Sequence, residues 1–191
     1  MRWLITSVFV LGSHALMTST TFTGVKIPSQ LISLHSPLWT MGMSVKIRIV
    51  GRKNGSEQWL EDAYSMYETR LRPSNLDVET LWHKSDPELI KAVVADKEKG
   101  HTIILMDPTG KMRSSEQFSE DLFSWMEEGG SRVVFVIGGA PGLPPELKDW
   151  ASKGKLISLS PMTFTHQFAR TILMEQIYRA SEIRKGSGYH K

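Results

Sequence analysis

Hydrophobic and polar positions follow two different periods along most of the chain. Residues 45–50 alternate apolar with basic side chains, which is the two-residue period of a strand with one buried face. Between positions 60 and 71, apolar residues recur every three to four positions, which is the spacing of an amphipathic helix. Pro73 should stop this helix, and Ser56 is the expected N-cap. The patterned part of the chain therefore begins with a strand and a helix.

Strand and helix periods continue to alternate as far as the C-terminus. Asp86 is an expected N-cap, Ser114 and Gln117 have the spacing of a capping box, and residues 107–110 have the composition of a turn. The further predicted strands cover 76–82, 101–106, 132–137 and 155–160, and the further helices cover 86–99, 114–128, a short stretch from 144 and 166–184. This order predicts an α/β fold class with a mostly parallel sheet and flanking helices, built as one domain over 44–191.

Residues 1–43 differ from this body in composition. They contain six Ser, six Thr and no acidic residue, which is typical of an organelle transit peptide. A secretory signal and an untargeted, disordered tail are the alternatives. The apolar run 4–11 is too short and too hydroxylated for a membrane span. We expect residues 1–43 to be a targeting extension, and we expect no membrane contact.

Composition excludes several classes of site. There is no cysteine, so disulfides, thiolate nucleophiles and cysteine-ligated metals are excluded. The six histidines form no HExxH pair, and we expect no metal. Residues 1–43 hold two of the 23 basic residues and none of the 20 acidic ones, so the body carries a net charge of +1. Contact with nucleic acid must therefore come from a local patch.

Three segments could carry chemistry, because parallel sheets bind ligands at the carboxyl ends of their strands. Residues 138–142 are glycine-rich but match neither the dinucleotide nor the phosphate-loop pattern, so a tight strand–helix turn is the alternative. Residues 159–164 mix apolar and hydroxyl side chains and suit a flat apolar group, or they simply lead into a helix capped by Thr165. Residues 164–191 carry a net charge of +3 and suit RNA contact, or they are a frayed terminus.

Together these segments resemble one family. Val136-Ile137-Gly138-Gly139-x-x-Gly142-Leu143, His166-x-x-x-Arg170, Glu175-Gln176-Ile177-Tyr178-Arg179-Ala180 and the terminal Tyr189-His190 occur in this order. The chain resembles, over residues 44–191, the ribosomal RNA large subunit methyltransferase H family of SPOUT methyltransferases. One departure is Lys191, where the family usually carries Arg and often a further acid, which affects a detail of phosphate or base contact.

The resemblance implies a fold, an activity and a set of site residues. The fold would be an α/β trefoil knot, and the enzyme would methylate N3 of a pseudouridine in bacterial-type large-subunit rRNA, using S-adenosyl-L-methionine. The catalytic residues would be His190, Tyr189 and Arg179. The cofactor-binding residues would be Met106, Gly138, Leu159, Ser160, Pro161, Met162, Thr163 and Phe164.

The resemblance also implies partners and a location. The enzyme would act as a homodimer in which the tail of one subunit completes the site of the other, and the near-neutral body favours an assembled ribosome over free RNA as substrate. The extension would direct it to a chloroplast or mitochondrion, or leave it cytoplasmic if it is no transit peptide. The alternatives are a non-catalytic ribosome-binding or assembly factor, a methyltransferase acting on another RNA, and a flavodoxin-like nucleotide-binding protein.

Overall fold

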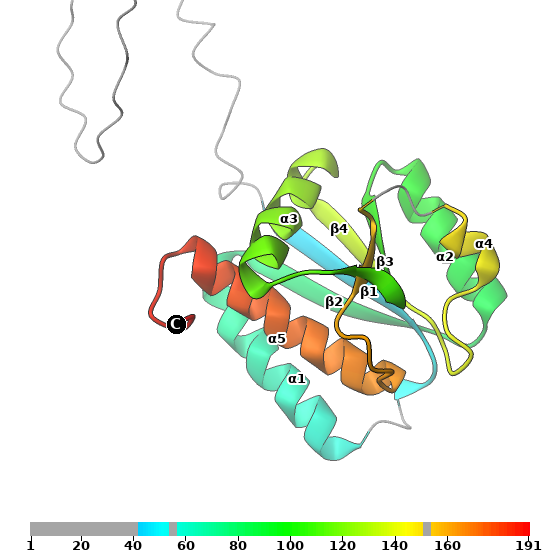
Figure 1. The fold of residues 1–191 in the computed structure, drawn as a ribbon, viewed down its shortest axis with the longest axis horizontal. Coiled ribbons are helices and arrows are strands. Elements are labelled where there is room, and N and C mark those ends of the chain that lie inside the picture. The colour runs from blue at the N-terminus through cyan, green and yellow to red at the C-terminus, as the bar shows by residue number, and fades with distance from the viewer. Residues whose placement is uncertain (1–41, 54–56, 151–153) are drawn as a thin grey trace, which may run out of the picture. The chain divides into compact units, whose positions relative to one another are not determined.

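A computed structural model describes residues 42–53, 57–150 and 154–191, and its centre is a five-stranded sheet (Figure 1). All of the strand pairs are parallel, and the strand order is β2-β1-β4-β3-β5. The strands are β1 (Met43–Val50), β2 (Leu76–His83), β3 (Thr102–Met112), β4 (Arg132–Ile137) and β5 (Leu156–Ser158). The prediction of an α/β fold with a parallel sheet is confirmed.

Helices cover both faces of this sheet. They are α1 (Gln58–Leu71), α2 (Asp86–Glu98), α3 (Ser115–Glu128), α4 (Pro145–Lys148) and α5 (His166–Arg184), with a short 3-10 helix η4 (Arg72–Ser74) after α1. Residues of α1, α3 and α5 share one hydrophobic core with one side of the sheet, and residues of α2 and α4 share a second core with the other side. Helices α1, α3 and α5 thus form one layer (Figure 1).

Helix starts agree only in part with the sequence signals. The capping box is confirmed, because the Ser114 hydroxyl accepts from the Gln117 N–H while the Gln117 side chain accepts from the Ser114 N–H. The prediction of Asp86 as an N-cap is wrong by one residue: Ser85 is the N-cap, and Asp86 is the first helical residue. Ser56 lies outside the described residues, and Glu57 is the N-cap of α1.

The predicted turn at residues 107–110 lies inside a strand. Strand β3 pairs with β5 at Met106, then bulges, and pairs again from Lys111, so that both residues face Ile157. A Cβ atom on Gly110 would lie 2.5 Å from the carbonyl carbon of Ile157, so this approach requires glycine. The prediction of a turn that ends the strand is wrong: the strand continues through residues 107–110 as a bulge and pairs with β5 on both sides of it.

Helix α5 contains a buried cation. Arg170 is 1% exposed, pairs with Glu61 of α1 and has its guanidinium 4.3 Å from the centre of the Tyr64 ring. Burying a charge without a partner is costly, so this ion pair and ring contact stabilise the packing of α5 on α1. Arg170 is therefore part of the core, although it belongs to a motif that the family resemblance singled out.

Candidate functional site

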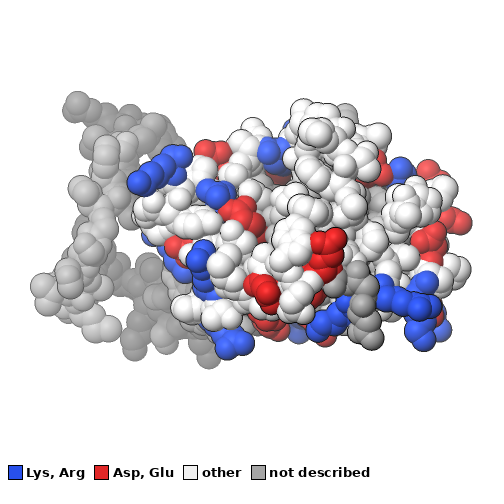
Figure 2. Space-filling view, turned by 90° about the horizontal axis from the view of Figure 1, so that it is seen from below, with Lys and Arg blue, Asp and Glu red and all other residues white. Residues whose placement is uncertain are grey.

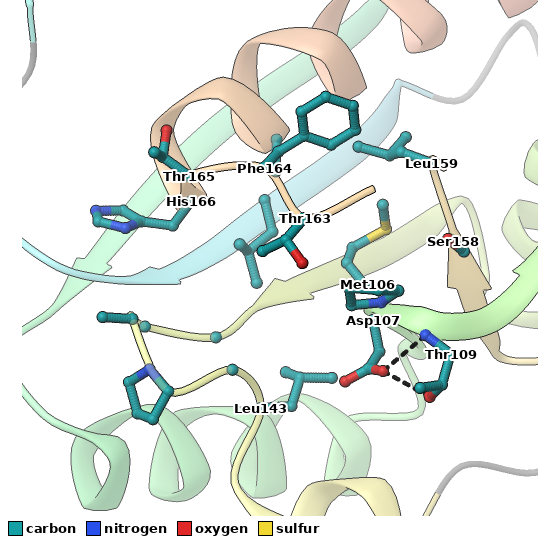
Figure 3. Close-up of a pocket in the computed structure, with 18 of the residues that line it drawn as sticks. Met106, Asp107, Thr109, Leu143, Ser158, Leu159, Thr163, Phe164, Thr165 and His166 are labelled. Atoms are coloured by element: carbon teal, nitrogen blue, oxygen red, sulfur yellow. Dashed lines mark hydrogen bonds between the residues drawn. The ribbon is translucent and has the colours of Figure 1, made fainter. Parts of the chain in front are cut away.

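A pocket of about 700 Å³ opens beside the bulge of β3 and at the carboxyl ends of β4 and β5 (Figure 3). Its wall consists of residues 106–109 at the bulge of β3, the glycine-rich segment after β4 and the segment that joins β5 to α5. The predicted cofactor residues that line it are Met106, Gly138, Leu159, Ser160, Met162, Thr163 and Phe164. Pro161 is exposed and is not part of the lining. Loops predicted from separate parts of the sequence thus share one cavity.

The glycine-rich segment is folded back on itself. A Cβ atom on Gly138 would lie 2.1 Å from the carbonyl oxygen of Gly142, and Gly142 has a φ of +93°. Gly139 and Gly142 also form an isolated antiparallel bridge. No larger residue fits at position 138, so the turn that bounds the pocket depends on glycine. The alternative of a tight strand–helix turn is correct as geometry, and the same turn forms a wall of the pocket.

Side-chain-to-backbone hydrogen bonds shape the segment after β5. The Ser158 hydroxyl donates to the Ser160 carbonyl at 2.7 Å, and the Ser160 hydroxyl accepts from the Met162 N–H at 3.1 Å. The Thr165 hydroxyl accepts from the Phe168 N–H at 3.3 Å and caps α5, as predicted. These bonds set the path of the loop before any ligand is bound.

One buried carboxylate, Asp107, lines the pocket, and no sequence motif indicated a functional role for it. Asp107 accepts from the N–H and hydroxyl of Thr109, at 2.9 and 2.6 Å (dashed in Figure 3), and its other oxygen lies 2.7 Å from Lys148 Nζ. Burial opposes ionisation of this group, but Lys148 and Thr109 outweigh it and hold the pKa of Asp107 below its usual range. The pocket therefore contains an ionised, fully partnered acid. His166 also lines it, and burial lowers the pKa of His166, which favours the neutral ring.

The three predicted catalytic residues form a second group, which we call the tail cluster: Glu116, Glu175, Arg179, Tyr189 and His190. One oxygen of Glu175 accepts from Nε and Nη2 of Arg179, at 3.0 and 2.6 Å, and from the Tyr189 hydroxyl at 3.2 Å. The Arg179 guanidinium also lies over the Tyr189 ring, 4.8 Å from its centre. Burial, the Tyr67 hydroxyl and Glu175 raise the pKa of Tyr189 to about 12, so its phenol stays protonated at neutral pH.

His190 completes the tail cluster. Its Nε2 lies 2.8 Å from Oε1 of Glu116, in the first turn of α3, and its Nδ1 lies 3.5 Å from Nη1 of Arg179. The resemblance gave no role to Glu116. It lies 74 positions before His190 and could not be connected with the tail from the sequence.

The pocket and the tail cluster are not in contact within one chain. His166, in the first turn of α5, lines the pocket, whereas Arg179 follows it by 13 residues on the same helix. At about 1.5 Å per residue, this spacing separates the two positions by about 20 Å along the helix. One chain therefore holds the two parts of the predicted site apart.

Residues 42–53, 57–150 and 154–191 contain neither a candidate metal site nor a candidate membrane-spanning helix. No group of three or more His, Asp or Glu side chains there is arranged to hold a metal ion. Within the same ranges, no helix is both long and apolar enough to cross a membrane.

Known proteins match nearly all of the described chain. The sequence profile of the family described as "Predicted SPOUT methyltransferase" matches residues 43–190. A protein of Protochlamydia amoebophila (strain UWE25), named ribosomal RNA large subunit methyltransferase H, is 48% identical over 147 residues, covering 77% of this chain and 99% of that protein. The chain belongs to the SPOUT methyltransferase family.

A further relative agrees with this assignment. The protein of the same name from Dictyoglomus thermophilum (strain ATCC 35947 / DSM 3960 / H-6-12) is 36% identical over 158 residues, covering 78% of this chain and 99% of that protein. This SPOUT family member is therefore homologous to the large subunit methyltransferase H proteins, as the sequence motifs indicated. The solved SpoU methyltransferase AviRb from Streptomyces viridochromogenes, in complex with AdoMet, is similar at 12% identity and a TM-score of 0.38, covering 76% of this chain and 58% of that one.

Proposed function

We propose that this chain methylates N3 of a pseudouridine in bacterial-type large-subunit rRNA, on the assembled ribosome, with S-adenosyl-L-methionine as methyl donor. The observation that carries the proposal is the pocket at the strand ends, lined by Met106, Gly138 and most of the 159–164 loop in a member of a methyltransferase family. The relatives named as rRNA large subunit methyltransferases favour this substrate over other RNA.

The pocket has the chemistry that S-adenosyl-L-methionine requires. About 700 Å³ suits a ligand of nucleoside size, and Ile137, Leu143 and Leu159 offer apolar contacts to a flat base. Ser158, Ser160 and Thr163 offer hydroxyl groups to polar parts of the ligand. Bound there, the cofactor supplies a methyl carbon that is already electrophilic, because it is attached to a positively charged sulfur.

The tail cluster and the pocket of one chain are about 20 Å apart, so they cannot form one site within that chain. In a homodimer the tail cluster of one chain would instead lie at the pocket of the other. Apolar surface suitable for such contact is present: Trp59 and Phe168 are 51% and 40% exposed, and their rings pack 5.2 Å apart. Met162 and Phe164, at the pocket, are also exposed. Figure 2 shows wide uncharged areas between the charged groups on the face seen from below.

The proposed trefoil knot has support in the pairing of β5. Ile157 pairs with β3 on both sides of the bulge, and Gly110 lies against the Ile157 backbone. The segment leading into the cofactor loop thus runs closely beside residues 106–112, as expected where a chain passes through a loop.

In the mechanism, His190 accepts the proton of the target N3, because a neutral imidazole is a base at working pH. Arg179 stabilises the negative charge that develops on the ring oxygens or holds a phosphate. The protonated phenol of Tyr189 stacks on the base or donates to one of its carbonyls. Much of the acceleration comes from positioning within the closed site.

The test is transfer of a labelled methyl group. The full-length chain is incubated with methyl-labelled S-adenosyl-L-methionine and bacterial-type ribosomes that lack the modification, and the label is mapped to a nucleotide. Label at N3 of a large-subunit pseudouridine is expected. Cofactor binding without label on the ribosome would indicate another RNA substrate, and ribosome binding without cofactor binding would indicate an assembly factor.

The location is a second part of the proposal. The acid-free, hydroxyl-rich residues 1–43 favour import into a chloroplast or mitochondrion, where bacterial-type ribosomes are found. A fluorescent protein fused after residue 43 should enter one of these organelles, and a diffuse cytoplasmic signal would contradict the proposal.

A further inference from the structure

The carboxylate of Glu116, in the first turn of α3, contacts the C-terminal tail. Oε1 of Glu116 lies 2.8 Å from Nε2 of His190, although the two residues are 74 positions apart. The neighbouring Ser115 hydroxyl lies 2.9 Å from Oε1 of Gln176 on α5, so this turn is attached to the helix that carries Arg179. Glu116 is therefore held on a rigid element beside a ring that belongs to no regular element.

The surroundings of Glu116 favour its ionised form. The capping box fixes the helix start on either side of it, and first-turn acids interact favourably with the positive end of a helix. Hydrogen bonds from the Ser114 hydroxyl and from His190 lower the pKa of Glu116 to about 2. The carboxylate therefore accepts hydrogen bonds and donates none at working pH.

The contacts of His190 define which ring nitrogen carries the proton. Nε2 faces a carboxylate, which can only accept, and Nδ1 faces Nη1 of Arg179, which can only donate, at 3.5 Å. In the neutral ring the proton is thus on Nε2 and the lone pair is on Nδ1. Nε and Nη2 of Arg179 are held by Glu175, so Nη1 is the nitrogen left to face the lone pair.

We propose that Glu116 is a positioning residue that orients His190, so that Nδ1 is the atom that accepts the substrate proton. This inference rests on the proposed function. The edge of a uracil-type ring presents an N3–H between two carbonyl groups, and Nδ1 beside Nη1 of Arg179 presents an acceptor beside a donor. Because Glu116 and His190 belong to the same chain, the tail brings an oriented base to the pocket of a second copy.

The proton and the electrons are accounted for in this step. The N3–H bond breaks, the proton passes to Nδ1 and its electron pair remains on N3. That pair forms the new bond to the methyl carbon, while the electrons of the broken carbon–sulfur bond stay on sulfur. His190 then carries protons on both nitrogens, and Glu116 balances the new positive charge. Arg179, which Glu175 pairs, lies at the Nδ1 side of the ring, and Lys191 is the next residue in the sequence.

The variants isolate the carboxylate. Glu116→Ala removes it from an exposed position with a residue that favours helix, so the fold should persist. Glu120→Ala, one turn further along α3 and also exposed, is the matched control. His190→Gln identifies the signal of this ring among the six histidines.

Two readouts on the full-length chain test the proposal. The His190 Nε2–H should give a protected proton signal in nuclear magnetic resonance spectra, which disappears in Glu116→Ala and remains in Glu120→Ala. In the methyl-transfer assay, Glu116→Ala should lower kcat about tenfold with KM for S-adenosyl-L-methionine unchanged, because the ring loses its orientation and the cofactor pocket is untouched.

Several results would overturn it. An unchanged kcat and an unchanged His190 proton signal in Glu116→Ala would show that the carboxylate does not orient the base. Equal losses in Glu120→Ala would show a general effect of charge on α3. If the wild-type chain binds S-adenosyl-L-methionine but transfers no methyl group, the proposed function fails instead. The proton signal then decides alone whether Glu116 orients His190.

Discussion

The pocket and the tail cluster specify their shapes by different means. The pocket is formed mainly by backbone: a glycine turn and one loop with two hydroxyl-to-backbone hydrogen bonds, beside one acid that is already paired. The tail cluster is formed by side chains, in which Glu175 and Glu116 hold Arg179, Tyr189 and His190. A backbone site should be sensitive to added atoms and indifferent to charge, whereas a side-chain cluster should show the opposite. Substitutions can test this contrast.

The largest effect should come from adding atoms to the glycine turn. Gly138→Val would place a Cβ atom 2.1 Å from the Gly142 carbonyl oxygen, so the turn must open. We expect a loss of about 3 kcal/mol or more in the free energy of unfolding and no binding of S-adenosyl-L-methionine. Thermal unfolding and calorimetry measure the two.

Gly188→Ala is the control for this substitution, because nothing lies within 4 Å of a Cβ atom at that position. Equal stability of the two variants would contradict the view that the pocket depends on the backbone.

The next largest effect should come from a substitution in the tail cluster, and it should change only kcat. Arg179→Ala removes a donor proposed to stabilise charge on the target ring, so kcat should fall about a hundredfold. Affinity for S-adenosyl-L-methionine should not change, because Arg179 is proposed to contact the target ring and not the cofactor, and it does not line the pocket. Lys185→Ala, beyond the end of α5 and paired only with Glu182 among the described residues, is the control. A parallel fall in affinity would show that the two regions are not separate.

The smallest of these effects concerns the one charge of the pocket. Asp107→Asn keeps an acceptor for Thr109 but loses the ion pair with Lys148, and should cost about 1–2 kcal/mol at neutral pH. Folding lowers the pKa of Asp107, so its contribution is complete above about pH 5 and is lost as pH falls through the lowered value.

Denaturant unfolding of wild type and Asp107→Asn between pH 7 and pH 3 measures this dependence. The stability difference should shrink as the solution becomes more acidic. A difference that grows toward low pH would show that the carboxylate is protonated in the folded chain.

Local signals predicted the elements well because they act within a few residues. The periods of β1 and α5, the capping box at Ser114 and the cap at Thr165 each depend on neighbours along the chain. The carboxyl ends of parallel strands lie at the same edge of a sheet. The positions of the glycine turn and the 159–164 loop after two such strands therefore predicted that both belong to one pocket.

Contacts between distant residues could not be predicted in this way. The bulge in β3 depends on β5, about 50 positions later, and the Asp107–Lys148 and Glu116–His190 pairs join residues from separate elements. The resemblance selected Arg179, Tyr189 and His190, but no local pattern indicates that α5 holds them away from the pocket. The bulge, the long-range pairs and the separation of the tail cluster from the pocket depend on how the folded elements pack. Helix caps and hydrophobic periods depend only on residues that are near in sequence.

The double pairing of β3 around Ile157 limits how this site could be transplanted. The 159–164 loop starts two residues after a position held from both sides of the bulge, where Gly110 permits the approach. A designer who moved that loop alone into another scaffold would leave behind the strand that shapes its entrance. To keep its shape, the loop must therefore be transferred as residues 156–164 together with residues 106–112, the strand segment that pairs with it.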